Sequence, residues 1–144
     1  MAIHNQAQDI VPKVKYEFEM LEWAAKKIKA EFSNADQPTK NMLLEVFLLH
    51  ARVLRDFFVK SPSDDDVSTQ HFFDAPSVWV SKANTLCQTL EKERVRLNKK
   101  LAHLTYSRLT EEEEWDFNGI HDELLKAKHE FLDALEPDQR KWFV

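Results

Sequence analysis

The chain has 144 residues, of which 43% are hydrophobic and 31% charged, and its formal net charge is -5. This length and apolar content exclude a disordered chain and suit one domain over residues 1–144. One glycine and five prolines offer few tight turns, which excludes most β folds. The acidic balance gives no overall attraction to nucleic acid, so polyanion binding would need a local basic patch.

Cysteine content and apolar runs indicate the compartment. Cys87 is the only cysteine, so no intramolecular disulfide can form, and the first residues lack the apolar run of a secretory signal. The apolar segment 41–54 is interrupted by Glu45, His50 and Arg52 and is shorter than the ~20 residues that span a bilayer. The sequence therefore predicts a cytoplasmic protein that does not cross a membrane.

Residues 10–33 are expected to form the first helix. The apolar positions alternate in steps of four and three, which places on one helix face Val14, Phe18, Leu21, Ala25, Ile28 and Phe32. Pro12 suits the first turn, where its missing N–H would have no intrahelical partner. A short SNADQP segment ends this helix, so the next helix is expected to be its antiparallel neighbour.

Residues 38–60 are predicted to form a second helix that is apolar around most of its circumference, which is typical of a central helix. Arg52 lies on its narrow polar line and can pair with Asp56 or Glu45. His50 points away from this line among apolar side chains. A buried imidazole needs a hydrogen-bond partner, so a structural role is favoured over a catalytic one.

The connection 60–77 is long for a compact domain and leaves room for a short extra helix. Phe72 and Phe73 are expected to pin this connection onto the bundle. The neighbouring carboxylates at 64–66 lack the alternating spacing and the glycine of a calcium loop, so a solvated turn is expected there.

Two further helices are expected at 77–104 and 110–136. An apolar stripe runs along the third, with a gap at Glu93 and Arg94, and the fourth opens with a capping box formed by Thr110 and Glu113. No run with the period of a strand is long enough to predict a sheet. The predicted fold is an all-α, up-and-down four-helix bundle.

The segment 94–108, RVRLNKKLAHLTYSR, concentrates positive charge in this acidic chain. On a continuous helix, Arg96 and His103 are seven residues apart and share a face. A guanidinium can grip a phosphate, and an imidazole can take the proton of an RNA 2′-hydroxyl, which would let that oxygen attack the adjacent phosphorus without a metal.

Four more cations of this segment would attract an RNA backbone, namely Arg94, Lys99, Lys100 and Arg108. The simpler alternative is the solvated face of a helix near its C-terminal end, where cations favour the helix dipole.

The run Arg96-Leu-Asn-Lys-Lys-Leu-Ala-His103 in an all-helical chain of this size resembles the HEPN superfamily. The signature of that superfamily is an arginine, four to six residues and a histidine, and here six residues intervene. By motif, the resemblance implies that Arg96 grips the phosphate, that His103 is the catalytic histidine and that Asn98 is a polar helper.

The resemblance also implies a bundle that commonly forms homodimers, in which two copies of the motif build one cleft. Many members are metal-independent endoribonucleases of toxin–antitoxin and antiphage systems, and others are not catalytic. The implied partners are RNA, an antitoxin protein and a second copy of the chain. Neither a cofactor nor a metal is implied.

Two other functions stay open. A helical interaction module would bind a protein partner through the apolar second helix and the C-terminal KWFV. A bundle metalloenzyme would need three of the six histidines, which would have to converge from different helices, because the spacing of His121 and His129 is poor for joint ligation. Cys87 follows Leu86 beside the apolar stripe and is interpreted as a small buried hydrophobe.

Overall fold

The computed structural model describes residues 2–63, 65–102 and 115–144, and the described residues form helices and no strand. The all-α prediction is confirmed. Among the described residues, every helix is too short or too polar to pass through a bilayer. The elements in chain order are α1 (Ala2–Glu31), η1 (Phe32–Asn34), α2 (Gln37–Val59), η2 (Thr69–Phe72), α3 (Ser77–Leu86), α4 (Gln88–Lys92), α5 (Arg94–Ala102), α6 (Phe117–Ala134), α7 (Pro137–Arg140) and η4 (Lys141–Phe143).

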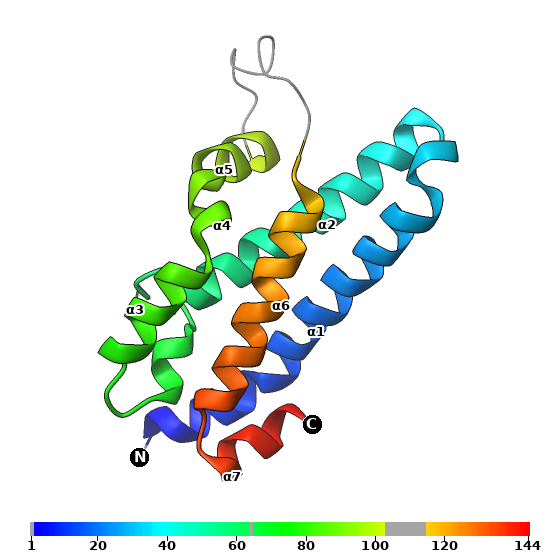
Figure 1. Ribbon diagram of the computed structural model, residues 1–144. Coiled ribbons are helices and arrows are strands. Elements are labelled where there is room, and N and C mark those ends of the chain that lie inside the picture. The colour runs from blue at the N-terminus through cyan, green and yellow to red at the C-terminus, as the bar shows by residue number, and fades with distance from the viewer. Residues whose placement is uncertain (1, 64, 103–114) are drawn as a thin grey trace.

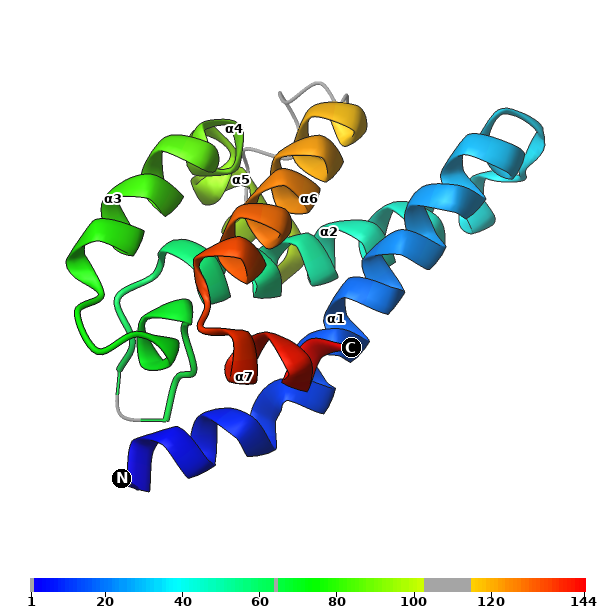
Figure 2. The same cartoon turned by 60° about the horizontal axis from the view of Figure 1, so that its bottom comes forward.

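The helix α2 occupies the centre of the molecule and packs against α1, α3, α5 and α6. As predicted, α1 and α2 are antiparallel neighbours, and the closed end of their hairpin projects past α6 (Figure 1). The two chain ends lie at the opposite end of the molecule, where the C-terminal residues pack beside α1 (Figure 2). The finer prediction of an up-and-down four-helix bundle stays a prediction.

The first helix begins at Ala2 and not near residue 10. Ala7 and Val11 are buried and extend the apolar stripe of α1 toward the N-terminus, so packing favours a longer helix. Pro12 therefore lies inside the helix and not in its first turn. Its ring is on the exposed side, and α1 bends in its N-terminal part (Figure 2), as expected where a proline removes a backbone hydrogen bond.

The predicted single helix 77–104 is wrong, because the chain breaks into α3, α4 and α5 at Cys87 and Glu93. A straight helix of that length would be about 40 Å long and would run away from the core. The breaks redirect the chain, so that Cys87, Leu90 and Leu97 are all fully buried. A tertiary contact compensates for the broken ladder, because the Thr89 N–H donates to a carboxylate of α6.

The connection between α2 and α3 is held by aromatic rings. Phe72 is buried and Phe73 stacks on Trp79, which confirms that these two phenylalanines pin the connection to the core. The indole N–H of Trp79 donates to the Thr69 hydroxyl at 2.7 Å, and this hydroxyl donates to the carbonyl of Phe58. The short extra helix that the sequence left room for is the 3-10 turn η2.

The predicted start of the last helix at residue 110, with its capping box of Thr110 and Glu113, lies outside the described residues. In the described part, Asp116 caps α6 by accepting a hydrogen bond from the Gly119 N–H at 2.9 Å. A Cβ atom at Gly119 would lie 2.2 Å from a carboxylate oxygen of Asp116. The only glycine of the chain therefore makes room for this cap.

Candidate functional site

The helix α5 carries most of the predicted site residues, and its Leu97 is fully buried where α5 packs on α2. Arg94 is exposed, and Arg96 and Asn98 are half-buried. Lys99 and Lys100 lie in the last turns of the same helix. The described structure therefore places five of the seven predicted residues on one short helix.

The remaining two predicted residues, His103 and Arg108, lie outside the described residues. His103 directly follows Ala102, the last residue of α5. The pairing of Arg96 with His103 therefore stays a prediction.

The guanidinium of Arg96 lies over the ring of Trp115. The guanidinium carbon is 3.9 Å from the centroid of the indole, and Nη1 is 3.4 Å from a carboxylate oxygen of Glu93. The Arg96 side chain is only 19% exposed, and Trp115 is at the border of full burial. Stacking on an indole and an ion pair together hold the guanidinium in a defined position.

We call Arg94, Arg96, Asn98 and Trp115 the α5 site. The sequence did not predict its Trp115 member, because this residue follows Arg96 by 19 positions and belongs to a different part of the fold. The planar guanidinium of Arg96 is the kind of group that recognises phosphate, and its contacts with Trp115 and Glu93 restrict where it can lie. The α5 site can therefore present a preorganised cation to an anionic ligand.

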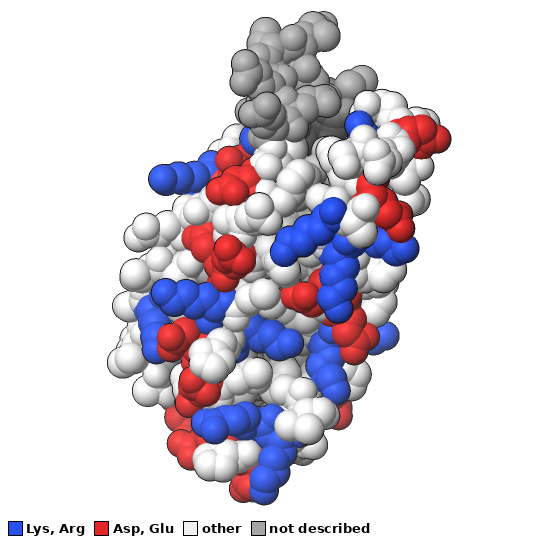
Figure 3. Space-filling model, turned by 45° about the vertical axis from the view of Figure 1, so that its right-hand side comes forward, with Lys and Arg blue, Asp and Glu red and all other residues white. Residues whose placement is uncertain are grey.

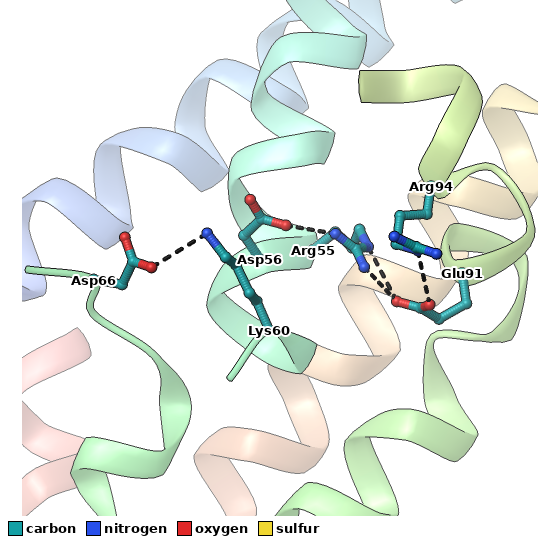
Figure 4. A network of polar contacts seen from close by, with 6 residues as sticks. All are labelled: Arg55, Asp56, Lys60, Asp66, Glu91 and Arg94. Atoms are coloured by element: carbon teal, nitrogen blue, oxygen red, sulfur yellow. Dashed lines mark hydrogen bonds and ion pairs between the residues drawn. The ribbon is translucent and has the colours of Figure 1, made fainter. Parts of the chain in front are cut away.

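A charged network lies beside the α5 site (Figure 4). The side chain of Arg55 is buried and donates from Nε and Nη2 to one oxygen of Glu91, at 3.1 and 2.6 Å, and from Nη1 to Asp56 at 2.6 Å. The other oxygen of Glu91 is 3.7 Å from Nε of Arg94. Glu91 thus links the core arginine of α2 to the α5 site.

Arg52 makes neither of the two ion pairs that the sequence left open to it, and the arginine of α2 that forms ion pairs in the described structure is Arg55. Neither Arg52 nor Glu45 makes a hydrogen bond or an ion pair within the described part of the chain. The reason is geometric: Arg55 faces the α4–α5 segment, where Glu91 is available, whereas Arg52 lies on the outer side of α2.

A second polar cluster follows the end of α2, where Lys60 is 3.2 Å from Asp66 (Figure 4). Asp66 also accepts hydrogen bonds from the hydroxyl and N–H of Ser63, and these bonds, followed by the contact with Lys60, lower the pKa of Asp66 to about 2. Lys60 and Asp66 line a pocket of about 310 Å³ between α1, α2 and the connection that follows α2. The pocket has apolar walls from Val53 and Phe57.

His50 is buried between α1 and α2, and its Nδ1 is 2.5 Å from a carboxylate oxygen of Glu17. The ring of Tyr16 meets the His50 ring edge-on, with centroids 5.9 Å apart. This confirms that the imidazole has a hydrogen-bond partner, which the sequence had not identified. Glu17 also lines the pocket described above, so the histidine lies behind a pocket wall and not at the α5 site.

Cys87 lies in the core beside two carboxylates. Burial, then Glu123 and Glu91, raise the pKa of its thiol to about 12. One oxygen of Glu123 accepts the Thr89 N–H at 2.7 Å, whereas the other is buried without a hydrogen-bond partner in the described structure. The thiol is therefore protonated at neutral pH, in keeping with the interpretation of Cys87 as a buried hydrophobe.

The two histidines of α6 each contact one carboxylate. His121 is 2.7 Å from Glu22, and the exposed His129 is 3.2 Å from Asp133. Across the described ranges, no three side chains of the types that bind metal ions are grouped together. On the face that Figure 3 shows, cationic and anionic side chains are interspersed.

Comparison with known proteins identifies no relative. No family model matches the chain, no curated protein is significantly similar to it, and no solved structure matches it. The function is therefore inferred from the α5 site and the residues around it.

Proposed function

We propose that this protein is a HEPN-like, metal-independent endoribonuclease, in which Arg96 and His103 act on the scissile phosphate of RNA. The observation that carries the proposal is the stacking of Arg96 on Trp115 at 3.9 Å, because it holds a phosphate-binding group in place on the helix that leads directly to His103. We propose that the four-helix bundle of that superfamily corresponds here to α1, α2, the segment α3–α5 and α6.

The proposed reaction is an internal transfer on RNA. His103 takes the proton of a 2′-hydroxyl, and the resulting oxygen attacks the adjacent phosphorus. The bond from phosphorus to the 5′-oxygen breaks, and the protonated His103 gives its proton to that leaving oxygen. The products are a 2′,3′-cyclic phosphate and a 5′-hydroxyl. Arg96 stabilises the charge that develops on the phosphoryl oxygens, and Asn98 assists as a neighbouring polar group.

Four cations bind the flanking phosphates in this proposal, namely Arg94, Lys99, Lys100 and Arg108. Such contacts make binding depend on salt and not on sequence. The proposed partners are RNA, a second copy of the chain and an antitoxin protein, and the proposed compartment is the cytoplasm. No cofactor takes part.

The test is cleavage of mixed structured and single-stranded RNA in the presence of EDTA. Wild-type protein is expected to cleave, and Arg96→Ala and His103→Ala are each expected to lose about 100-fold or more in rate, as for removal of an acid–base or charge-stabilising group. Arg96→Lys should be intermediate, because an ammonium keeps the charge and loses the planar fork.

The matched control is His129→Ala, which removes an exposed histidine whose only described contact is Asp133 on its own helix. It should cleave like the wild type. Each variant is checked by circular dichroism, so that a loss of rate in a folded protein is distinguished from unfolding. The catalytic proposal would be overturned if the wild type did not cleave RNA, or if Arg96→Ala and His103→Ala both cleaved it as fast as the wild type. Either result would favour the interaction-module interpretation.

A further inference from the structure

The outer side of α2 carries an apolar stripe that its own chain leaves uncovered. Met42, Leu49 and Val53 are 50%, 47% and 40% exposed, and the half-buried Val46 completes the spacing of four, three and four residues. Such spacing is the seam of a helix that packs against another helix. We call Met42, Val46, Leu49 and Val53 the α2 stripe.

The α2 stripe stands out from the rest of the surface. Among the described residues it holds three of the eight exposed large hydrophobic side chains, more than any other helix. Two more, Tyr16 and Trp23, lie on α1, and Val78 of α3 and Val95 of α5 stand singly. Isolated exposed apolar residues are ordinary, but a line of them on one helix indicates a contact surface. The helix α2 begins on the part of the α1–α2 hairpin that projects past α6 (Figure 1), and the exposure of Met42, Leu49 and Val53 shows that the protomer itself leaves the stripe accessible.

Two opposite charges flank the α2 stripe. Glu45 and Arg52 are seven residues apart and so lie on the same flank of the helix. Within the described part of the protomer neither makes an ion pair or a hydrogen bond. A helix pairs its flanking charges with those of a partner helix when the two pack along such a seam.

We propose that a second copy of this chain packs on the α2 stripe, with the two α2 helices antiparallel about a two-fold axis. Val46 then meets Leu49 of the second copy, and Met42 meets its Val53. The same arrangement brings Glu45 beside Arg52 of the second copy, and the two-fold axis repeats this ion pair on the other side. A parallel pairing would place the two charged flanks on opposite sides of the helix pair, where Glu45 cannot meet Arg52 of the second copy, so the charges favour the antiparallel dimer.

This inference does not rest on the proposed ribonuclease activity. Its test contains no RNA and reports on assembly alone, so failure of the dimer and failure of the catalytic proposal are separate results.

The test is sedimentation equilibrium of the full chain from micromolar to submillimolar concentration. Wild type is expected to be a dimer, and Leu49→Glu is expected to weaken the dimer at least about tenfold, because it places a carboxylate at the centre of the seam. Val78→Glu is the control, since it puts the same carboxylate at an exposed valine of α3, and it should dimerise like wild type.

Charge swaps test the orientation. Glu45→Arg and Arg52→Glu should each weaken the dimer about two- to fivefold, because each sets like charges side by side, and the double variant should regain wild-type affinity. A monomeric wild type, a dimer that Leu49→Glu leaves unchanged, or a double variant no stronger than the single variants would overturn the inference. Circular dichroism of each variant shows whether a loss of dimer reflects unfolding.

Discussion

At one end of the molecule, Phe131 contacts a ring of aromatic side chains from α2, η2, α3 and η4, whereas at the other end α5 is anchored by Leu97 and surrounded by charges. The aromatic rings at the first end pack on one another, so their contribution is to stability. At the second end, Arg96 and Arg94 each contact a glutamate, and Trp115 holds a cation in place. The difference suggests that stability and function are separated along the molecule.

The largest expected effect is at the aromatic end. Phe131→Ala would leave a cavity among rings that include Phe57, Phe72 and Trp79, and should lower the free energy of unfolding by about 3–5 kcal/mol. Urea unfolding followed by circular dichroism measures it, with Val78→Ala as the exposed control. A loss below about 1 kcal/mol would show that the rings are not the stabilising centre.

The next effect is at the border of the two ends. Arg55→Met keeps the apolar stem and removes the hydrogen bonds to Glu91 and Asp56, which should lower the free energy of unfolding by about 1–3 kcal/mol. Arg94→Met removes only an exposed pair and is the matched control, with an expected change within about 0.5 kcal/mol. If the two variants were equally stable, the hydrogen bonds of Arg55 would not tie α4 to the core.

Cys87 gives a pH-dependent test. Since its folded pKa is raised from 9.0 to about 12, the unfolded chain releases the thiol proton first as pH rises, so the stability that burial contributes is complete below about pH 9 and is lost above it. The stability of wild type relative to Cys87→Ala should therefore fall by about 1 kcal/mol between pH 8 and pH 10. An unchanged difference would place the thiol in contact with water.

The smallest effect on stability should come with an effect on binding. Arg94→Ala is expected to change the free energy of unfolding by less than about 0.5 kcal/mol, because its pair with Glu91 is exposed. The same variant should lower the slope of RNA affinity against salt concentration by about one, as one phosphate contact is lost. Fluorescence anisotropy with labelled RNA at several salt concentrations measures this, and an unchanged slope would remove Arg94 from the proposed surface.

Local periodicity was enough to predict the helices α1 and α2, because their buried positions repeat at the spacing of a helix, and the short connection between them was enough to predict that they are antiparallel neighbours. Periodicity could also have shown that Arg55 faces inward, since this residue follows the buried Ala51 by four positions and Leu48 by seven. The breaks at Cys87 and Glu93 could not be predicted this way. They depend on contacts such as Thr89 with Glu123, which join residues 34 positions apart.

The same limit applies to the candidate site. The basic character of residues 94–100 was evident from composition. The position of Arg96, however, depends on its contact with Trp115, and helical periodicity does not predict a contact between residues so far apart in the sequence. For His50, the sequence predicted that a buried imidazole needs a hydrogen-bond partner, but it did not identify Glu17 as that partner.

The decisive measurement is the rate of RNA cleavage in EDTA by wild type, Arg96→Ala, Trp115→Leu and the double variant, each shown to be folded. If Trp115 acts by holding Arg96, Trp115→Leu should lose most of the rate, and it should cost nothing further in the protein that already lacks Arg96. Additive losses, a fully active Trp115→Leu variant or an inert wild type would contradict the placement of function at the α5 site.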